Sequence, residues 1–517
     1  MRSQSWLVAA LGTSVVIAIG GAGLSAGVSD EPLVITHGIA SGDVTPTSAV
    51  IWARASGKAQ MHVEIDTDPV FARAKSRHSA AAREDADFTA HLTVDGLQPA
   101  TRYWYRVWFS GAGADGRSHV GDNQVGTFTT APASGDSRPV SFVLAGDVGG
   151  QRYCRNAATG GYAIFGAMEA LNPTFVIVNG DAIYADGDCP FIGPEPGWVN
   201  IPGTFPSIAD PAVDWNNVAA VRDVYLQHWR YNRADPYTQS LLRSTSSISQ
   251  WDDHEVINDF GASWTYWNSA NVNRTGYPNI VAAGLDTFFA YSAIERNSVE
   301  RDRIYRSFRW GQDLEVFVLD ARSYRDRNDT LDTLPEPKAM LGREQIAWLV
   351  DGLQQSTATW KVVSSDVPIS IPTGSLTFGR DAWARLPGEP PTGFRRELLD
   401  LVAALDRINA QNVVFVATDV HYATNLAYSV DADGDGDFLT LYEVVRGPLN
   451  AAKAPPRTAA QLDPSVHPTV LYAEGGLFNF GFVRINRQSD GKVHLVADVR
   501  DEHGVQRPGS VLDLTPQ

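Results

Sequence analysis

Aspartates stand at the ends of four apolar segments, and two of these ends also carry a histidine. The segments are SFVLAGD (141–147), FVIVNGD (175–181), SISQWDDH (247–254) and NVVFVATDVH (412–421). A single aspartate of this kind more often caps a helix than binds a ligand, but four of them favour a shared site. Carboxylates buried together must be neutralised by protons or by metal ions. Aspartate and histidine side chains around two metal ions would suit the hydrolysis of phosphoric esters.

The segments that carry these residues alternate with helix-like segments. Strands are expected at 141–147, 175–181, 360–366 and 412–421, and helices at 160–172, 341–356 and 395–409. This alternation is typical of an α/β sheet with helices on both faces. In open α/β sheets ligands bind beyond the carboxyl ends of the strands, which is where the aspartates lie. We therefore expect a catalytic α/β domain over residues 138–517.

The first part of the chain has a different pattern. Short β-rich runs, separated by turn residues, occupy 48–55, 61–66, 91–97, 101–109 and 126–130. They predict an antiparallel all-β sandwich over residues 30–132, followed by a short linker. The run LQPATRYWYRVWF (97–109) resembles a strand signature of fibronectin type III domains. No chemistry is assigned to this domain.

The N-terminus indicates export. Residues 1–29 combine one arginine, an apolar stretch and small residues, which is typical of a cleaved signal peptide. An uncleaved membrane anchor is the alternative, because the stretch is about long enough to span a bilayer. Cleavage would leave no stable membrane span and a secreted or periplasmic protein.

The two cysteines support the same compartment. Cys154 and Cys189 both fall in loops rich in glycine and aspartate. In an exported chain such a pair predicts one disulfide, with metal ligation as the alternative.

The overall composition argues against one further class of function, nucleic acid binding. The 517 residues include 42 Lys+Arg and 59 Asp+Glu, which gives a formal net charge of −17. This acidity argues against nucleic acid binding, because phosphate backbones attract basic surfaces. An acidic enzyme can still bind phosphate where metal ions supply positive charge locally.

Several motifs resemble one known family in order, spacing and flanking residues. They are HGIASGDVTPTSAVIWAR (37–54), NGDAIYAD (179–186), QWDDHEVIND (250–259), LDARSYR (319–325), MLGREQIAWL (340–349) and ATDVHYA (417–423). The chain resembles the alkaline phosphatase D branch of the metallophosphoesterase superfamily. The resemblance implies a four-layer sheet sandwich flanked by helices, preceded by a fibronectin-III-like all-β domain.

The resemblance also implies metal ligands. Asp181 corresponds to a carboxylate that bridges two metal ions and is part of the catalytic centre, and Tyr184 to a phenolate ligand of a ferric ion. His421 would bind the same ion. Asp147 stands where this branch usually has a cysteine ligand, which leaves the identity of the metal more open.

A second metal site and the catalytic acid follow from the same resemblance. Asp253 and Asp419 would bind the second cation, which in this branch is calcium. His254 would protonate the leaving oxygen or steady the phosphoryl group. The expected cofactors are therefore Fe³⁺ and Ca²⁺, although other divalent metals also fit such ligands. The superfamily's middle motif has no counterpart, and Asp366 or Ser365 is expected near a metal instead.

Basic residues near the motifs could clamp a phosphate, because arginine matches phosphate oxygens in bidentate fashion. They are Arg322 and the group Arg222, His228, Arg230 and Arg233. Of these, Arg322 is our predicted substrate-binding residue, and salt bridges with nearby aspartates are the alternative for each.

Together these features predict an exported metal-dependent phosphoesterase that uses a metal-activated hydroxide. Its substrate would be a small phosphate monoester or diester, or a phospholipid. The alternatives are a phosphodiesterase similar to phospholipase D and a cell-surface metal-binding protein without turnover.

Overall fold

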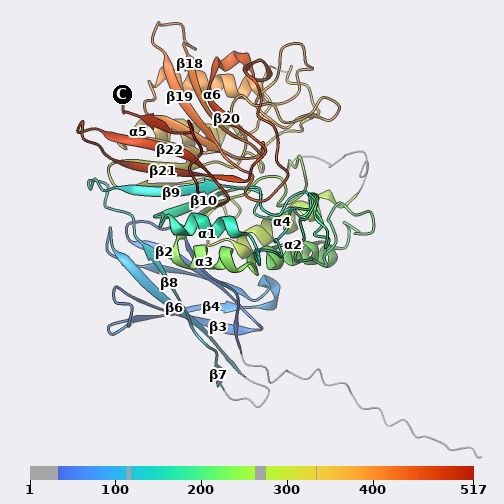
Figure 1. The fold of residues 1–517 in the computed structure, drawn as a ribbon, viewed down its shortest axis with the longest axis vertical. Helices are drawn as coiled ribbons and strands as arrows, with labels where there is room; N and C mark the ends of the chain where they lie inside the picture. Colours follow the sequence, from blue (N-terminus) through green and yellow to red (C-terminus); the bar gives the residue numbers. More distant parts are fainter. Residues whose placement is uncertain (1–32, 113–117, 262–274, 334) are drawn as a thin grey trace, which may run out of the picture.

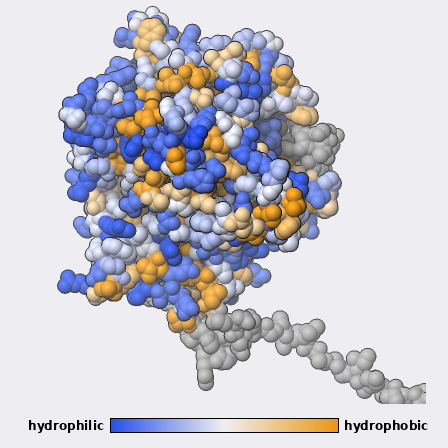
Figure 2. Space-filling view, viewed as in Figure 1, coloured by the Kyte–Doolittle hydropathy of each residue, from blue (hydrophilic) through white to orange (hydrophobic). Residues whose placement is uncertain are grey.

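The computed structural model describes residues 33–112, 118–261, 275–333 and 335–517. The predicted signal peptide, residues 1–29, lies outside the described residues. Within the described part of the chain, no helix is both long and apolar enough to cross a membrane. On the face seen in Figure 2, hydrophobic residues form scattered small patches among hydrophilic ones.

Two large sheets form the centre of the molecule (Figure 1). The first has nine strands in the order β23 (Leu512–Leu514), β22 (Val493–Asp501), β21 (Asn479–Arg487), β9 (Val140–Ala145), β10 (Phe175–Asn179), β11 (Ser246–Gln250), β1 (Ile35–Gly42), β2 (Ser48–Ala55) and β5 (Thr89–Asp95). The second has seven strands in the order β12 (Arg306–Trp310), β13 (Leu314–Val318), β14 (Trp360–Ser364), β17 (Val413–Ala417), β19 (Leu439–Val445), β18 (Ala423–Val430) and β20 (Pro468–Glu474). A two-stranded hairpin pairs β15 (Gly374–Ser375) with β16 (Gly379–Arg380).

The two sheets pack face to face through apolar side chains. Phe142 and Phe175 of the first sheet share one buried core with Trp310, Val316 and Val414 of the second. The rings of Phe175 and Trp310 lie 4.8 Å apart between centroids. The central strands pair in parallel and are largely buried on both faces, which requires a covering layer on each outer side.

Helices supply these outer layers. The first sheet is covered by α1 (Ala163–Ala170), α2 (Val218–Arg233), α3 (Pro236–Ser244) and α4 (Tyr277–Tyr291). The second sheet is covered by α5 (Gly342–Gln355) and α6 (Arg395–Arg407). The α6 stripe Leu398, Leu401, Val402 and Leu405 is buried, as the spacing of an amphipathic helix requires. The predicted four-layer α/β fold is therefore confirmed.

The N-terminal region is all-β, as predicted, and it continues the large sheet. A separate five-stranded sheet contains β3 (Ala59–Asp66), β4 (Lys75–Ala82), β6 (Arg102–Ala112), β7 (Ser118–Val120) and β8 (Gln124–Thr129). The other N-terminal strands, β1, β2 and β5, extend the nine-stranded sheet instead. The junction is a parallel pairing of β1 with β11, in which Gly42 lies opposite Ser247. One hydrophobic core runs through both regions.

Candidate active site

Sharp turns at the carboxyl ends of strands carry the aspartates and one histidine. Asp147 follows β9, Asp181 follows β10, and Asp419 with His421 follows β17. Their φ angles are 64°, 50°, 70° and 60°, in the left-handed region that residues other than glycine seldom adopt. Such strained turns are typical of functional sites, because the surrounding structure must hold them. The turns bring side chains from separate strands to one edge of the sheets.

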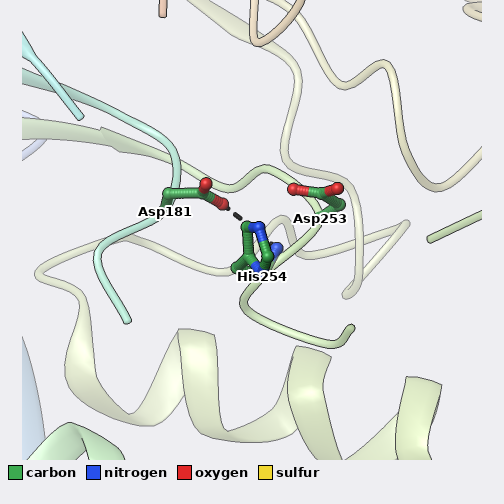
Figure 3. Close-up of side chains that lie close together, drawn as sticks. All are labelled: Asp181, Asp253 and His254. Carbon is green, nitrogen blue, oxygen red and sulfur yellow. Dashed lines mark hydrogen bonds between the residues drawn. The ribbon is translucent and has the colours of Figure 1, made fainter. Parts of the chain in front are cut away.

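Two groups of these residues are close enough to share a cation. Ligand-capable atoms of Asp181, Asp253 and His254 lie within 4.8 Å of one another, and those of Asp252, Asp253 and Asp419 do the same. Figure 3 shows the first group, with the main-chain N–H of His254 donating to Asp181 Oδ1 at 3.1 Å. Asp253 belongs to both groups and therefore lies between them.

Tyr184 and His421 meet on one side of this cluster. The Tyr184 hydroxyl oxygen is 2.9 Å from His421 Nε2, and that nitrogen is 3.8 Å from Asp147 Oδ1. His421 Nδ1 lies 2.5 Å from the Ala452 carbonyl oxygen, to which it can donate only if it carries the proton. Burial lowers the pKa of His421 to about 4, so the ring is neutral at pH 7. Nε2 is then unprotonated, so its lone pair can accept a hydrogen bond from the Tyr184 hydroxyl or bind a metal ion.

The carboxylates of the cluster are buried and incompletely paired. Among the described residues, both oxygens of Asp147 and one oxygen each of Asp252, Asp253 and Asp419 have no hydrogen-bond partner. Burial raises the pKa of Asp147 to about 8 and the pKa values of Asp181, Asp252 and Asp419 well above the ordinary range. Buried oxygens of this kind need a proton or a cation, so the donor set fits metal ions with hard oxygen and nitrogen ligands.

Arginine side chains occupy the other side of the cluster. Arg322 Nε lies 2.5 Å from Asp252 Oδ1, and Arg322 Nη1 lies 2.8 Å from Asp381 Oδ2. Arg325 also pairs with Asp381, which accepts a hydrogen bond from Asn328 Nδ2 at 2.6 Å. Arg322, our predicted substrate-binding residue, is fully buried, and its guanidinium contacts these aspartates.

Arg322 also lies close to Asp253, the carboxylate that belongs to both metal-capable groups. Arg322 Nη2 is 3.9 Å from Asp253 Oδ1. Burial opposes ionisation of Asp253, but Arg322 and His254 together hold its pKa below the usual value. Asp253 is therefore an anion among carboxyl groups whose pKa values are raised, namely those of Asp147, Asp181, Asp252 and Asp419.

Asp366 and Ser365 lie at the end of β14, behind the cluster. Asp366 Oδ2 accepts from the Ala321 main-chain N–H at 3.1 Å, and Asp366 Oδ1 accepts from Gln250 Nε2 at 3.3 Å. Ser365 Oγ donates to the Val367 carbonyl oxygen at 2.7 Å. Neither residue belongs to a metal-capable group among the described residues.

His254 is held by a carboxylate to which sequence reasoning assigned no role. His254 Nδ1 lies 2.6 Å from Asp186 Oδ1, and Asp186 Oδ2 accepts from the Asn258 main-chain N–H at 3.0 Å. The imidazole also stacks on Tyr184, with ring centroids 4.0 Å apart. Burial disfavours the charged imidazole, but Asp186, Asp253 and Asp181 raise the pKa of His254 well above 6.5. His254 therefore carries a proton that it can donate.

Sequence reasoning also missed three further carboxylates. Glu255 accepts hydrogen bonds from the main-chain N–H groups of Asp181, Ala182 and Asp252 at 3.1, 2.6 and 2.8 Å. These bonds hold the turn after β10 against the turn after β11. Asp259 and Asp381 form a third metal-capable group with Asp253. Glu255 and Asp259 lie within the quoted motif 250–259, whereas Asp381 lies in an irregular segment without a strand-end signal.

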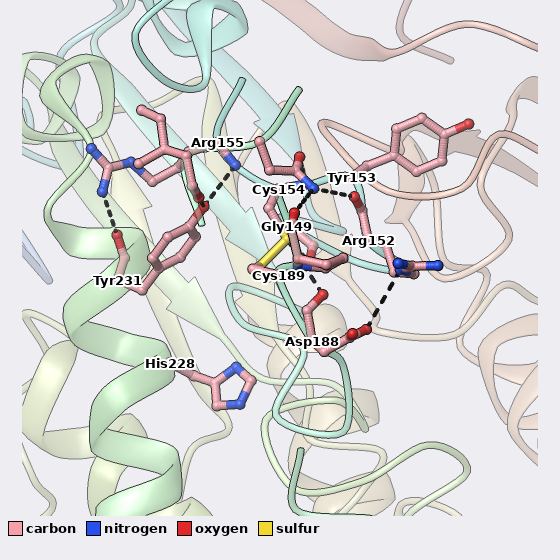
Figure 4. The surroundings of a disulfide bond; sticks show 12 residues. Gly149, Arg152, Tyr153, Cys154, Arg155, Asp188, Cys189, His228 and Tyr231 are labelled. Carbon is pink, nitrogen blue, oxygen red and sulfur yellow. Dashed lines mark hydrogen bonds and ion pairs between the residues drawn. A yellow bond between two sulfur atoms is a disulfide. The ribbon is translucent and has the colours of Figure 1, made fainter. Parts of the chain in front are cut away.

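A disulfide joins two of the loops that lead away from the cluster (Figure 4). Cys154 and Cys189 have Cα atoms 5.7 Å apart. The first loop follows Asp147, and the second follows Tyr184. An ion pair between Arg152 and Asp188, at 3.8 Å, lies beside the disulfide. The covalent link therefore restrains the side of the cluster that contains Tyr184.

Known proteins share both the sequence pattern and the fold. Residues 145–492 match the model of a family described as PhoD-like phosphatase, and residues 23–132 match that of the N-terminal domain of PhoD-like phosphatases. Alkaline phosphatase D of Bacillus subtilis (strain 168) is 24% identical over 448 residues, which cover 80% of this chain and 70% of that protein.

Two solved structures superpose over almost the whole chain. A structure of PhoD has a TM-score of 0.70 at 18% identity and covers 96% of this chain and 90% of its own. Purple acid phosphatase PPD1 from yellow lupin (Lupinus luteus) seeds has a TM-score of 0.56 at 12% identity, covering 94% and 74%. At these identities the two structures support the fold alone.

Proposed function

Because the chain belongs to the PhoD-like phosphatase family and is a hydrolase acting on phosphoric ester bonds, we propose that its hydrolysis depends on a ferric ion and calcium. The observation that carries this proposal is the set of buried, partnerless carboxylate oxygens, above all the two oxygens of Asp147. An apolar interior does not tolerate such groups without a neutralising cation or proton.

The donor types suggest how the cations are divided. Asp147, Tyr184 and His421 would hold the ferric ion, because phenolate and carboxylate are hard, charged donors suited to a trivalent metal. Asp253 and Asp419 would hold calcium, which prefers oxygen ligands. Asp181 would be a ligand of both cations. Bound at these positions, the cations would neutralise the phosphoryl oxygens and lower the pKa of an attacking water molecule.

Residues of the chain would donate the proton and hold the donating imidazole in place. His254 would protonate the leaving oxygen of the ester, because it retains a proton in the cluster. Asp186 would orient the imidazole through its contact with Nδ1, which leaves Nε2 to face the substrate. Glu255 would keep the Asp181 turn in place through its three main-chain hydrogen bonds.

The substrate in this proposal is a phosphate monoester or diester handled outside the cytoplasm. Export is supported by the signal-like residues 1–29 and by the disulfide between Cys154 and Cys189. A buried cluster that holds both a protonated His254 and an ionised Asp253 favours catalysis over a purely structural metal site.

The test is an assay with nitrophenyl phosphate and bis-nitrophenyl phosphate on the purified protein. Activity should disappear after removal of metal and return when iron and calcium are restored together. Full turnover of the metal-free protein would contradict metal dependence. The ratio of the two rates would establish the preference for monoester or diester.

A further inference from the structure

The phenol ring of Tyr184 is buried in the candidate active site and contacts two of its histidines. The residue is 3% exposed, and its ring stacks on the His254 imidazole with centroids 4.0 Å apart. Its hydroxyl oxygen is 2.9 Å from His421 Nε2. The ring therefore touches both the proposed proton donor and a proposed iron ligand, and a displacement of the ring would change these contacts.

The main chain of Gly150 lies directly against this ring. A Cβ atom added at residue 150 would lie 2.5 Å from Cζ of Tyr184, 2.6 Å from Cε1 and 2.7 Å from Cε2. Non-bonded carbon atoms pack best at about 3.5–4.0 Å, so the space does not admit even a methyl group. A side chain at residue 150 would therefore displace the phenol ring.

The backbone conformation of residue 150 does not itself require a glycine. The nearby Gly149 and Gly180 have φ angles of 81° and 85°, in the left-handed region that favours glycine. The φ angle of Gly150 lies outside that region. An alanine could therefore adopt the same backbone conformation, and the close contact with Tyr184 is what an added Cβ would disrupt.

Hydrogen bonds on both sides hold the buried main chain at Gly150 in place. The Gly149 N–H donates to the Asn450 carbonyl oxygen at 2.8 Å, and the Gly150 carbonyl oxygen accepts from the Tyr153 N–H at 2.9 Å. The disulfide of Cys154 ties down the end of the same loop (Figure 4). Because these bonds oppose movement of the loop, an added methyl group would move the phenol ring instead.

We propose that Gly150 is a positioning residue for phosphoric ester hydrolysis, because its bare α-carbon lets the Tyr184 ring lie against the His254 imidazole. The inference rests on the proposed function, which gives Tyr184 and His254 their roles in the reaction. Gly150 acts only through the ring and does not touch the substrate. A displaced ring would move the proton donor relative to the leaving oxygen, and a misplacement of about 1 Å can cost about 10²-fold in rate.

The variant Gly150→Ala tests this role in protein saturated with iron and calcium. We expect kcat for nitrophenyl phosphate to fall by on the order of 10²-fold while KM changes little, and the visible band of the ferric phenolate to shift. The control is Gly135→Ala, because a Cβ at residue 135 meets no atom within 4 Å beyond its chain neighbours. A wild-type kcat and an unshifted band in Gly150→Ala would refute the proposal.

Removal of the ring distinguishes a clash with Tyr184 from general damage to the loop. Tyr184→Ala leaves space for the added methyl group, so Gly150→Ala should cause no further loss of stability when it is combined with Tyr184→Ala. Urea unfolding of the metal-free proteins measures this, and the double variant gives the answer even if Gly150→Ala alone does not fold. A loss as large in the Tyr184→Ala background as in the wild type would refute the proposal.

The variant His254→Ala separates a failure of this inference from a failure of the proposed function. We expect it to lower kcat strongly, because it removes the proton donor. A wild-type kcat in His254→Ala would show that the proposed role of His254 is wrong, and the positioning role of Gly150 would fall with it. If His254→Ala is impaired and Gly150→Ala is fully active, only the role of Gly150 is refuted.

Discussion

The two sides of the carboxylate cluster differ in how their charge is balanced. The tyrosine side, defined as Asp147, Tyr184 and His421, has no ion pair with a described lysine or arginine. The arginine side, defined as Asp252, Asp381 and Arg322, is held together by a fully buried guanidinium. Among the described residues, the first side thus has no arginine or lysine partner, whereas the second already has a buried guanidinium.

This difference indicates which cation each side would hold. A site whose carboxylate is not paired with arginine can accommodate the higher metal charge, and its phenol and carboxylate suit a trivalent ion. A site whose aspartates are partly neutralised by arginine suits a divalent ion with oxygen ligands. The contrast therefore supports iron on the tyrosine side and calcium near the arginine side. The following predictions test this difference between the two sides.

The largest effect is expected at Asp181, which in our proposal contributes to both metal sites. Asp181→Asn should release both metals and reduce kcat by on the order of 10³-fold or more, because one charge that serves both ions is removed. Metal content and nitrophenyl phosphate hydrolysis measure this change. Asp351→Asn, on the exposed face of α5, is the matched control and should behave as wild type. Unchanged metal content in Asp181→Asn would refute the shared position.

Arg322 should affect stability more than substrate binding. Arg322→Met leaves Asp252 without its buried arginine partner and leaves Asp381 with Arg325 alone, which should lower the unfolding free energy of the metal-free protein by about 3–5 kcal/mol. Urea unfolding measures this loss. The exposed pair of Arg343 with Glu336 provides the control Arg343→Met, for which about 0–1 kcal/mol is expected. A raised KM with unchanged stability would instead support the predicted role of Arg322 in substrate binding.

Loss of the disulfide should weaken iron binding on the tyrosine side. Cys154 and Cys189 are separated by 35 positions, and closing such a loop stabilises by about 3–4 kcal/mol in the chain-entropy model. Cys154→Ser combined with Cys189→Ser should lower the unfolding free energy by this amount and weaken iron binding. Calcium affinity serves as the internal control and should stay the same. Equal weakening of both metals would remove the distinction between the sides.

Tyr184→Phe removes a single hydroxyl group from the tyrosine side, and the smallest effect is expected here. Tyr184→Phe should abolish the visible band of a ferric phenolate and lower iron affinity by at least about 10–100-fold, a loss typical of removing one supporting group from a metal site. Absorption spectra and iron titration measure both effects. Tyr153→Phe, which loses a hydroxyl bonded to Glu195 outside the cluster, should keep the band. A band that persists in Tyr184→Phe would show that another group binds the iron.

Much of the architecture could be predicted because the buried strands of a parallel sheet have a recognisable local sequence pattern. Apolar β-branched runs ending in aspartate indicated that Asp147, Asp181 and Asp419 would share one site. In the structure Asp147 and Asp181 follow strands of the nine-stranded sheet, and Asp419 follows a strand of the seven-stranded sheet. The same runs indicated strands buried on both faces, and the alternating helices indicated the layers that cover them.

Other features depend on pairings that no local pattern specifies. The alternation at 48–55 predicts a strand but does not reveal that β2 follows β1 into the large sheet through Gly42 and Ser247. Asp381 reaches the cluster from an irregular segment beside Arg325 and Asn328, so only tertiary packing places it there. Asp186 lies within a quoted motif, but its contact with His254 depends on how two loops fold together.

The division of the cluster between two different cations is tested most directly by metal analysis of the wild-type protein before and after treatment with a calcium-selective chelator. We predict that the protein contains iron and calcium together and shows a visible absorption band. The chelator should remove calcium and activity while iron and the band remain. A colourless protein without iron, or loss of both metals in parallel, would contradict the assignment of different cations to the two sides.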